Sequence, residues 1–287
     1  MPDVSSNPGD VWSTEYENYH ETSKAYDDTR SPVGVEVILG SFASSPKPLH
    51  KQTMLDGGCG TGNYIAAMQK QIGTIHGLDL NQGMLVQARN KFPRAASVHL
   101  LQGSLDCLPY RDAMFDAMMC NQVVHHLSTG EEAEPFSRLR NLAAEAYRVL
   151  RSGGVLVFNT SSHRQLRDGY WWADLIPAAV HKIARRFPTL ECMCSMLEEV
   201  GFYCRDLIVL VDEVLQGKSY LDPHGPFYKA YRDGDSTWSL TTAEELQNAL
   251  TRLQAMHDDG SIVSYLQQRE QLRHRVGQTT CVVARKQ

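Results

Sequence analysis

Hydrophobic and polar positions change period along the chain in a regular way between residues 52 and 211. Short apolar runs bounded by turn residues predict strands, and apolar residues three or four apart predict helices. Strands alternating with helices pair in parallel through right-handed crossovers, which predicts an α/β fold with a doubly wound, mostly parallel sheet. The predicted strands are Gln52–Asp56, Thr74–Asp79, Ser97–Gln102, Phe115–Asn121, Val155–Thr160 and Tyr203–Val211. The predicted helices are Gly62–Gln71, Gly83–Lys91, Glu132–Leu150 and Leu190–Val200.

The two ends of the chain depart from this alternation. Two helices are predicted between about Trp12 and Phe42, and a seventh strand at Thr279–Ala284. Residues 212–277 separate the last two strands and contain a helix that starts at Thr241 or Thr242, each followed three residues later by Glu as in a capping box. We therefore expect four parts: an N-terminal helical cap (1–45), a core of alternating strands and helices (46–211), an insertion (212–277) and a closing strand of the core (278–287).

Composition and charge narrow the class of protein. With 287 residues, 42% hydrophobic and 21% charged, the chain is expected to fold as one domain with insertions. No apolar run approaches the roughly 18 residues of a membrane helix, and the first thirty residues lack the apolar stretch of a secretory signal. Seven cysteines spread along the chain predict free thiols in a reducing compartment, hence a cytoplasmic protein. The net charge of −5 disfavours a nucleic-acid partner.

A glycine-rich segment, Leu55-Asp56-Gly57-Gly58-Cys59-Gly60-Thr61-Gly62-Asn63, follows the first predicted strand. Its glycines let the backbone approach a ligand closely, and the following helix N-terminus offers N–H groups to an anionic ligand. Asp79 ends the next strand, at a spacing that suits a ribose diol. The dinucleotide fingerprint G-x-G-x-x-G needs glycine where Asn63 stands, which weakens a nicotinamide-dependent dehydrogenase. The turn therefore predicts a nucleotide-like ligand.

The order D-G-G-C-G-T-G-N resembles motif I of the class I S-adenosylmethionine-dependent methyltransferases. Later segments are similar to further motifs of that family in the correct order, namely Gly77-Leu78-Asp79-Leu80 with Gly83-Met84-Leu85, Gln102–Tyr110, Phe115–Leu127 and Arg148–Gly154. The resemblance covers roughly Ala25 to Leu210 plus the closing strand, and it extends to the small-molecule group that includes ubiquinone, menaquinone and arsenite methyltransferases. It implies S-adenosylmethionine as the cofactor.

The resemblance assigns roles to individual residues. Gly58 and Gly60 would admit the methionine portion of the cofactor, and Asp56 would orient the loop or the cofactor amino group. Asp79 would accept the ribose hydroxyls. The adenine would lie against Leu80 and face Ser104 and Leu105, with Ser104 standing where many relatives carry Asp. Further residues expected in cofactor binding are Tyr26, Arg30, Gly57, Asn63, Met84, Asn121 and Gln122.

Arg30 precedes the first helix of the sheet domain, in Tyr26-Asp27-Asp28-Thr29-Arg30. A guanidinium pairs bidentately with a carboxylate, so Arg30 is a candidate lid over the cofactor carboxylate. The alternative is a surface helix with one solvated arginine.

His125 and His126 follow the fourth strand, where cofactor and acceptor are expected to meet. Histidine titrates nearest to neutrality, so either residue suits removal of a proton from an amine, phenol or thiol acceptor. The alternative is structural, because one of two adjacent histidines commonly packs inward and hydrogen-bonds the backbone.

Cys192 and Cys194 invite a metal or metalloid interpretation, since arsenite methyltransferases hold arsenic with cysteines. On a helix, residues two apart point about 200° away from each other, so these thiols do not hold one ion together. We expect Cys194 in the core and Cys192 near the surface, and no metal.

Aromatic residues in the variable segments are candidate substrate contacts: Tyr19, Trp171, Trp172 and Tyr220. With Phe227, Tyr228, Tyr231 and Trp238 they would line a pocket for a flat or apolar acceptor. The alternative is that they form the core of the insertion.

The function predicted from the sequence is methyl transfer from S-adenosylmethionine to a small-molecule acceptor by in-line displacement. Modification of RNA is an alternative, because wobble-uridine tRNA methyltransferases carry a similar Val-Val-His-His segment followed by Ser-Thr, as at Ser128-Thr129. A third possibility is a regulatory protein that binds the cofactor without catalysis. The sequence leaves the acceptor and the oligomeric state open.

Overall fold

The computed structural model describes residues 30–93, 96–233 and 235–287. In that part of the chain seven strands form one sheet in the order β3-β2-β1-β4-β5-β7-β6. Only β7 runs antiparallel to its neighbours β5 and β6, so the prediction of a seven-stranded, mostly parallel sheet is confirmed. The strands are β1 (Thr53–Gly57), β2 (Thr74–Asp79), β3 (Val98–Gln102), β4 (Phe115–Asn121), β5 (Leu150–Thr160), β6 (Phe202–Leu210) and β7 (Thr279–Lys286).

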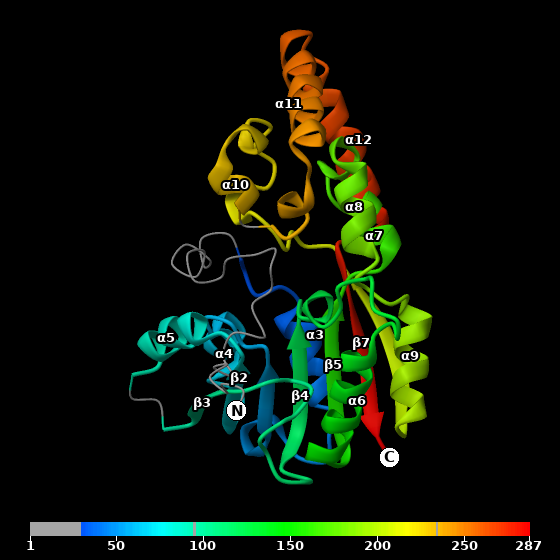
Figure 1. Ribbon diagram of the computed structural model, residues 1–287. Helices are drawn as coiled ribbons and strands as arrows, with labels where there is room; N and C mark the ends of the chain where they lie inside the picture. The colour runs from blue at the N-terminus through cyan, green and yellow to red at the C-terminus, as the bar shows by residue number, and fades with distance from the viewer. Residues whose placement is uncertain (1–29, 94–95, 234) are drawn as a thin grey trace, which may run out of the picture.

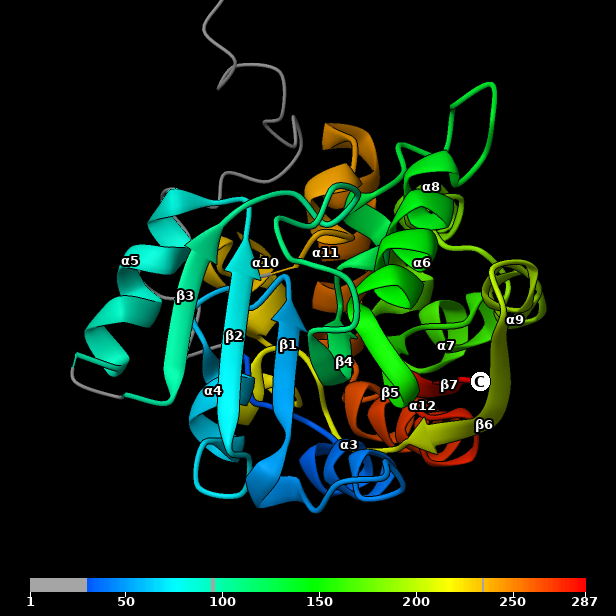
Figure 2. The same ribbon diagram turned by 90° about the horizontal axis from the view of Figure 1, so that it is seen from below.

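Helices cover both faces of the sheet (Figures 1 and 2). Three pack on one face: α3 (Val35–Phe42), α4 (Asn63–Met68) and α5 (Gln82–Lys91). Two pack on the other: α6 (Ser137–Val149) and α9 (Leu190–Glu199). The second of the two predicted N-terminal helices is thus α3, which covers the sheet, whereas the first lies outside the described residues.

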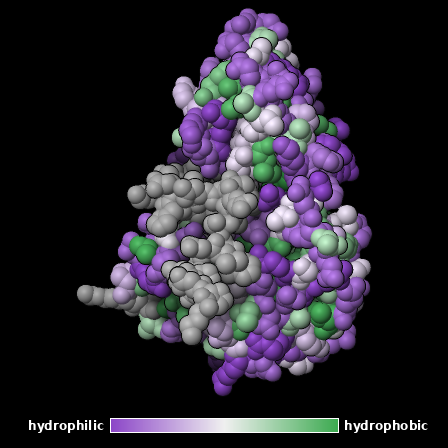
Figure 3. All heavy atoms as spheres, in the orientation of Figure 1, coloured by the Kyte–Doolittle hydropathy of each residue, from purple (hydrophilic) through white to green (hydrophobic). Residues whose placement is uncertain are grey.

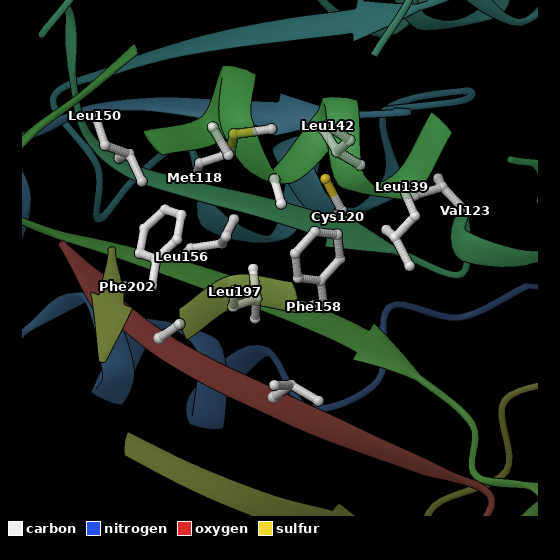
Figure 4. Close-up of a cluster of buried hydrophobic side chains, with 14 of the residues drawn as sticks. Met118, Cys120, Val123, Leu139, Leu142, Leu150, Leu156, Phe158, Leu197 and Phe202 are labelled. Carbon is white, nitrogen blue, oxygen red and sulfur yellow. The ribbon is translucent and has the colours of Figure 1, made fainter. Parts of the chain in front are cut away.

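Alternation along the central strands produces two hydrophobic cores. On β4, Met118 and Cys120 point toward α6 and α9, while Ala117 and Met119 point toward α3 and α4. Figure 4 shows the first of these cores, where side chains from β4, β5 and α6 meet Leu197 of α9. Successive residues of a strand face opposite sides of the sheet, so a strand without alternation is expected to have helices packed on both faces. β4 fits this expectation, because it is buried along its whole length.

A second helical layer lies beyond the carboxyl ends of the parallel strands (Figure 1). It consists of α7 (His163–Asp168), α8 (Pro177–Ala184), α10 (Lys229–Asp233), α11 (Ala243–Asp258) and α12 (Ile262–Val276). Its core combines residues 170–180 with residues 220–262, so the segment after β5 joins the predicted insertion in one hydrophobic unit. Thr242 caps α11 by accepting from the backbone N–H of Glu245 at 3.1 Å, which settles the start of that helix.

Buried polar contacts attach this layer to the sheet. The Gln278 side chain accepts from Val214 N–H at 2.7 Å and donates to Gly169 O at 3.0 Å. Arg273 of α12 has a 5% exposed side chain, pairs with Glu213 at 3.1 Å and donates to Val211 O. Hydrogen bonds are directional, so these bonds to buried backbone groups fix how the second layer is oriented on the sheet. The insertion is therefore held in a defined position above the strand ends.

Over the described atoms of the face drawn in Figure 3, hydrophilic side chains predominate and hydrophobic ones are scattered in small groups. No helix in the described ranges is both long and apolar enough to cross a membrane.

Candidate functional site

A cavity opens where the carboxyl ends of β1 and β4 meet, at the point where the strand order reverses. This is the ordinary place for a ligand in an open α/β sheet. The empty space is about 990 Å³ out to its open mouth. Its walls come from the loop after β1, the loop after β4, the segment before α3, and residues 161–187 and 214–237 of the second layer.

The glycine loop forms one wall. Gly58 has φ +77°, and a Cβ there would overlap the Val123 side chain. Gly60 has φ +52°, and nothing lies within 4 Å of where its Cβ would be. Both glycines take a backbone conformation that other residues rarely adopt. Gly58 therefore permits close packing against the loop after β4, whereas Gly60 leaves space open on the cavity side.

Asp79 at the end of β2 holds this loop in place. One carboxylate oxygen accepts from Gly60 N–H at 2.7 Å and the other from Asn81 N–H at 2.8 Å. Burial raises the pKa of Asp79, and these backbone hydrogen bonds offset part of that effect. The acid at the second strand thus has a clear structural task, besides the ligand role expected from the sequence.

Asp56 and Asn121 present unsatisfied polar atoms to the cavity. Within the described part of the chain, Asp56 Oδ2 and both amide atoms of Asn121 are buried without a hydrogen-bond partner. Burial first, and the nearby Asp79 second, raise the pKa of Asp56 to about 8. Buried polar atoms are normally paired, so this site is built for a polar ligand. A ligand ammonium group fits a carboxylate in this position.

The loop after β4 is held in an uncommon backbone conformation. Gln122 has φ +53°, and its N–H donates to Asn159 O at 2.9 Å. Tyr64 of α4 donates to Val33 O at 2.9 Å and accepts from Val33 N–H at 3.1 Å. Non-glycine residues with positive φ cluster at functional sites. Sequence reasoning did not select Tyr64, which lines the cavity and ties the segment before α3 to α4.

His125 and His126 lie on the cavity wall with ring centroids 4.0 Å apart. The His125 ring also stacks on Phe187 at 5.1 Å. Burial, followed by the charges of Arg186 and Arg30, lowers the pKa of His126 to about 3. Burial, the neighbouring His126 and the same arginines also lower the pKa of His125. Both imidazoles are therefore neutral at neutral pH, and each has one ring nitrogen that carries no proton.

The far side of the cavity combines apolar and polar groups. The apolar walls are Leu166, Tyr170, Ile183, Phe187, Val214 and Leu215. The polar group is the run Asp235-Ser236-Thr237 of the insertion, in which Asp235 accepts from Thr237 N–H at 2.6 Å. Small-molecule sites are mostly apolar with a few placed polar groups, and this end has that composition.

Trp171, Trp172 and Tyr220 are not among the residues that line the cavity. All three are fully buried in the core of the second layer, where the Trp171 indole N–H donates to Tyr220 O at 2.5 Å. These three residues thus belong to the core of the insertion, which was the alternative interpretation of their sequence pattern. Their neighbour Tyr170, which the sequence did not single out, reaches the cavity instead.

The predicted cofactor residues divide into two groups. The cavity brings together Arg30, Asp56, Gly58, Gly60, Asn63, Asn121 and Gln122. Gly57, Asp79, Leu80, Met84, Ser104 and Leu105 lie outside its lining. Met84 is buried, and the Ser104 hydroxyl donates to Asp106, which is itself paired with Arg138 at 2.7 Å. Tyr19 and Tyr26 fall outside the described residues.

Within the described ranges no three His, Cys, Asp or Glu side chains are arranged to hold a metal ion.

The fold and the cavity together define an α/β protein with a ligand site where the strand order reverses. The site has glycine-lined space and a buried acid on one side and two neutral histidines on the other.

Residues 55–158 match the family model described as a methyltransferase domain. A malonyl-[acyl-carrier protein] O-methyltransferase of Serratia marcescens is 36% identical over 143 residues, 48% of this chain and 49% of the relative. An enzyme of the same name from Enterobacter lignolyticus is 31% identical over 50% of this chain and 52% of the relative. The chain spans about half the length of these curated relatives.

A solved structure from Anabaena variabilis, described as a methyltransferase from an antibiotic biosynthesis pathway, superposes with a TM-score of 0.66. It is 20% identical and covers 90% of this chain and 99% of its own. Residues 55–158 thus carry a methyltransferase domain, and the Anabaena variabilis structure shares the fold of the chain.

Proposed function

We propose that this protein transfers the methyl group of S-adenosylmethionine to a small-molecule acceptor held beside His125 and His126, releasing S-adenosylhomocysteine. One observation carries the proposal. A single cavity joins the glycine loop and the unsatisfied Asp56 and Asn121 to the wall that holds both histidines. A cofactor on the first side and an acceptor on the second would meet at the ends of β1 and β4.

The residues present fit the cofactor. Asp56 would hold its ammonium group, and the open space at Gly60 would admit its methionine portion. Asp79 would hold the ribose hydroxyls while keeping the loop in place. Leu80, which is 40% exposed beside this site, would pack on the adenine.

When bound, S-adenosylmethionine supplies a methyl group on a positively charged sulfur, which an acceptor lone pair displaces in line. Such a reaction needs alignment and exclusion of water more than a strong base, and alignment alone supplies about 7–11 kcal/mol. Asn121 and Gln122 would orient the reacting groups from the end of β4, and the apolar wall of Tyr170 and Phe187 would exclude water from the acceptor.

The histidines would act on the acceptor as hydrogen-bond acceptors. An imidazole with a pKa of about 3, as at His126, is a weak proton acceptor, because taking the proton fully would leave a buried cation beside Arg186 and Arg30. A neutral ring nitrogen still accepts a hydrogen bond from an acceptor N–H or O–H and so aims the lone pair at the methyl carbon. We therefore assign His126 an orienting role ahead of full proton removal.

The test is to titrate S-adenosylhomocysteine into the purified protein by calorimetry, with NADH as a control ligand, and then to screen acceptors for S-adenosylhomocysteine release. Micromolar binding of the first ligand and product release with a small amine, thiol, phenol or carboxylate would support the proposal. Binding without turnover on any acceptor would favour a regulatory protein. Steeply salt-dependent tRNA binding with methylation of the tRNA would favour the RNA alternative. Binding of NADH instead would contradict the cofactor assignment.

A pH dependence follows from the Asp56 carboxyl. Its raised pKa of about 8 means that it is protonated in the free protein at pH 7, whereas pairing with a ligand ammonium requires the carboxylate. The affinity for S-adenosylhomocysteine should therefore fall about tenfold per pH unit below pH 8, with about one proton released per ligand bound. Calorimetry in two buffers of different ionisation enthalpy, between pH 6 and pH 8, measures both quantities.

The matched control is Asp56→Asn, which keeps the shape of the side chain and removes the titration. This variant should bind more weakly at pH 8 and lose the dependence on pH between 6 and 8. An unchanged slope in the variant would show that another group releases the proton.

A further inference from the structure

We propose that Cys194 of α9 and Cys204 of β6 form a reversible thiol–disulfide site, remote from the cavity, that reacts with peroxides. The proposal does not depend on the function proposed above, since neither cysteine lines the cavity.

The two sulfur atoms are already in contact. Cys204 Sγ donates to Cys194 Sγ across 2.7 Å, and both residues are half-buried where α9 packs against β6. A disulfide has sulfur atoms about 2.05 Å apart. The two sulfur atoms therefore need to approach each other by well under an ångström to form the bond.

The local fold brings this pair together. α9 ends at Glu199, Gly201 turns the chain with φ +104°, and β6 begins at Phe202. Cys204 pairs in register with Ala284 of β7, on the sheet face that α9 covers. The chain thus turns back after α9, so that β6 lies against the helix and Cys194 and Cys204 face each other.

The other cysteines do not share this arrangement. Cys192, two positions before Cys194 on the same helix, is half-buried against the same core as Cys194, rather than at the surface as expected, but makes no sulfur–sulfur contact. Cys107 is exposed on a loop, and Cys59, Cys120 and Cys281 are buried. No other sulfur–sulfur contact occurs among the described residues.

Burial gives the two sulfurs different reactivity. Burial and the adjacent Cys194 raise the pKa of Cys204, which leaves Cys194 as the sulfur that reacts first. The Cys194 thiolate attacks a peroxide oxygen, the O–O bond breaks, and a sulfenic acid and one water result when hydrogen peroxide is the oxidant. The Cys204 sulfur then attacks that sulfenic sulfur, the S–O bond breaks, and a second water leaves. Two electrons pass from the two thiols to the peroxide.

The disulfide would brace the edge of the sheet. It would close a short loop that contains the α9–β6 turn, and a cross-link stabilises chiefly by restricting the unfolded chain. For a loop of this length we expect the thermal midpoint to rise by about 5 °C. The affinity for S-adenosylhomocysteine should stay unchanged.

The experiment exposes the native full chain to hydrogen peroxide, blocks the remaining thiols with iodoacetamide and maps the peptides by mass spectrometry. We expect one disulfide between Cys194 and Cys204, the raised thermal midpoint, and reversal of both by dithiothreitol. Cys194→Ser and Cys204→Ala should each remove the linkage and the thermal shift. Cys192→Ser, the matched control on the same helix, should keep both.

Full alkylation of Cys194 and Cys204 after peroxide treatment of the native protein would overturn the proposal. A disulfide that persists in Cys194→Ser through another cysteine would also overturn it. Reduced wild type and each variant are compared by thermal unfolding, so that a variant that fails to fold is recognised, and the alkylation result on the wild type stands by itself.

Discussion

Replacing Asp79 with alanine is expected to weaken S-adenosylhomocysteine binding by at least about 100-fold. The carboxylate holds Gly60 N–H at 2.7 Å and Asn81 N–H at 2.8 Å, and in the proposed complex it also holds the ribose hydroxyls. Hydrogen bonds to a charged group contribute about 1.5–3 kcal/mol each, and about 1.4 kcal/mol corresponds to tenfold in affinity. Two such bonds to the ribose account for the stated loss. Calorimetric titration of the variant measures it.

Asp112→Ala is the control for a lost carboxylate, because Asp112 is exposed and pairs with Arg148 away from the cavity. It should bind the ligand as the wild type does. Thermal unfolding of both variants separates loss of binding from loss of fold. Wild-type affinity in a folded Asp79→Ala protein would refute the placement of the ribose.

His126→Ala should lower the turnover number by about 100-fold while changing cofactor affinity by less than about threefold. The magnitude is the lower end of what a positioned proton-accepting group contributes, which matches an imidazole whose pKa is lowered to about 3. Because protonation would occur only near that pH, turnover of the wild type between pH 7 and pH 5.5 should show no loss that depends on His126. The measurement is steady-state kinetics with the acceptor found in the screen.

His126→Gln tests the orienting role, since a glutamine side-chain oxygen accepts a hydrogen bond but takes up no proton. Partial recovery of turnover relative to alanine supports orientation, and no recovery supports proton removal by the imidazole. Equal turnover in His126→Ala and the wild type would remove this residue from the chemistry.

The sheet and the glycine loop were predictable because their signals are local. Strands β2 and β4 have the bounds that the apolar runs predict, and parallel pairing places the carboxyl ends of such strands at one edge. Gly58 and His125 are distant in the chain, yet each follows a strand of the sheet. Topology alone therefore brings them to one cavity.

The second layer was harder to predict, because an aromatic side chain has the same sequence signal in a core as in a binding wall. Trp171 and Tyr170 are adjacent, and only the packing of α11 and α12 decides that the indole is buried and the phenol lines the cavity. The partner of Cys194 was missed for a related reason. Helical spacing excluded Cys192, but identifying Cys204 needs the packing of α9 on β6.

The position of β7 has a consequence for the order of folding. This strand comes after all the others in the chain but lies inside the sheet, between β5 and β6. Until it inserts, β5 is an open edge with unpaired backbone groups, and β6 has no neighbour to join. Pairings between distant segments form slowly, and an open edge invites association with other chains. Newly synthesised molecules should therefore be most prone to aggregate just before residues 279–286 become available, and a chaperone would be most useful at that moment.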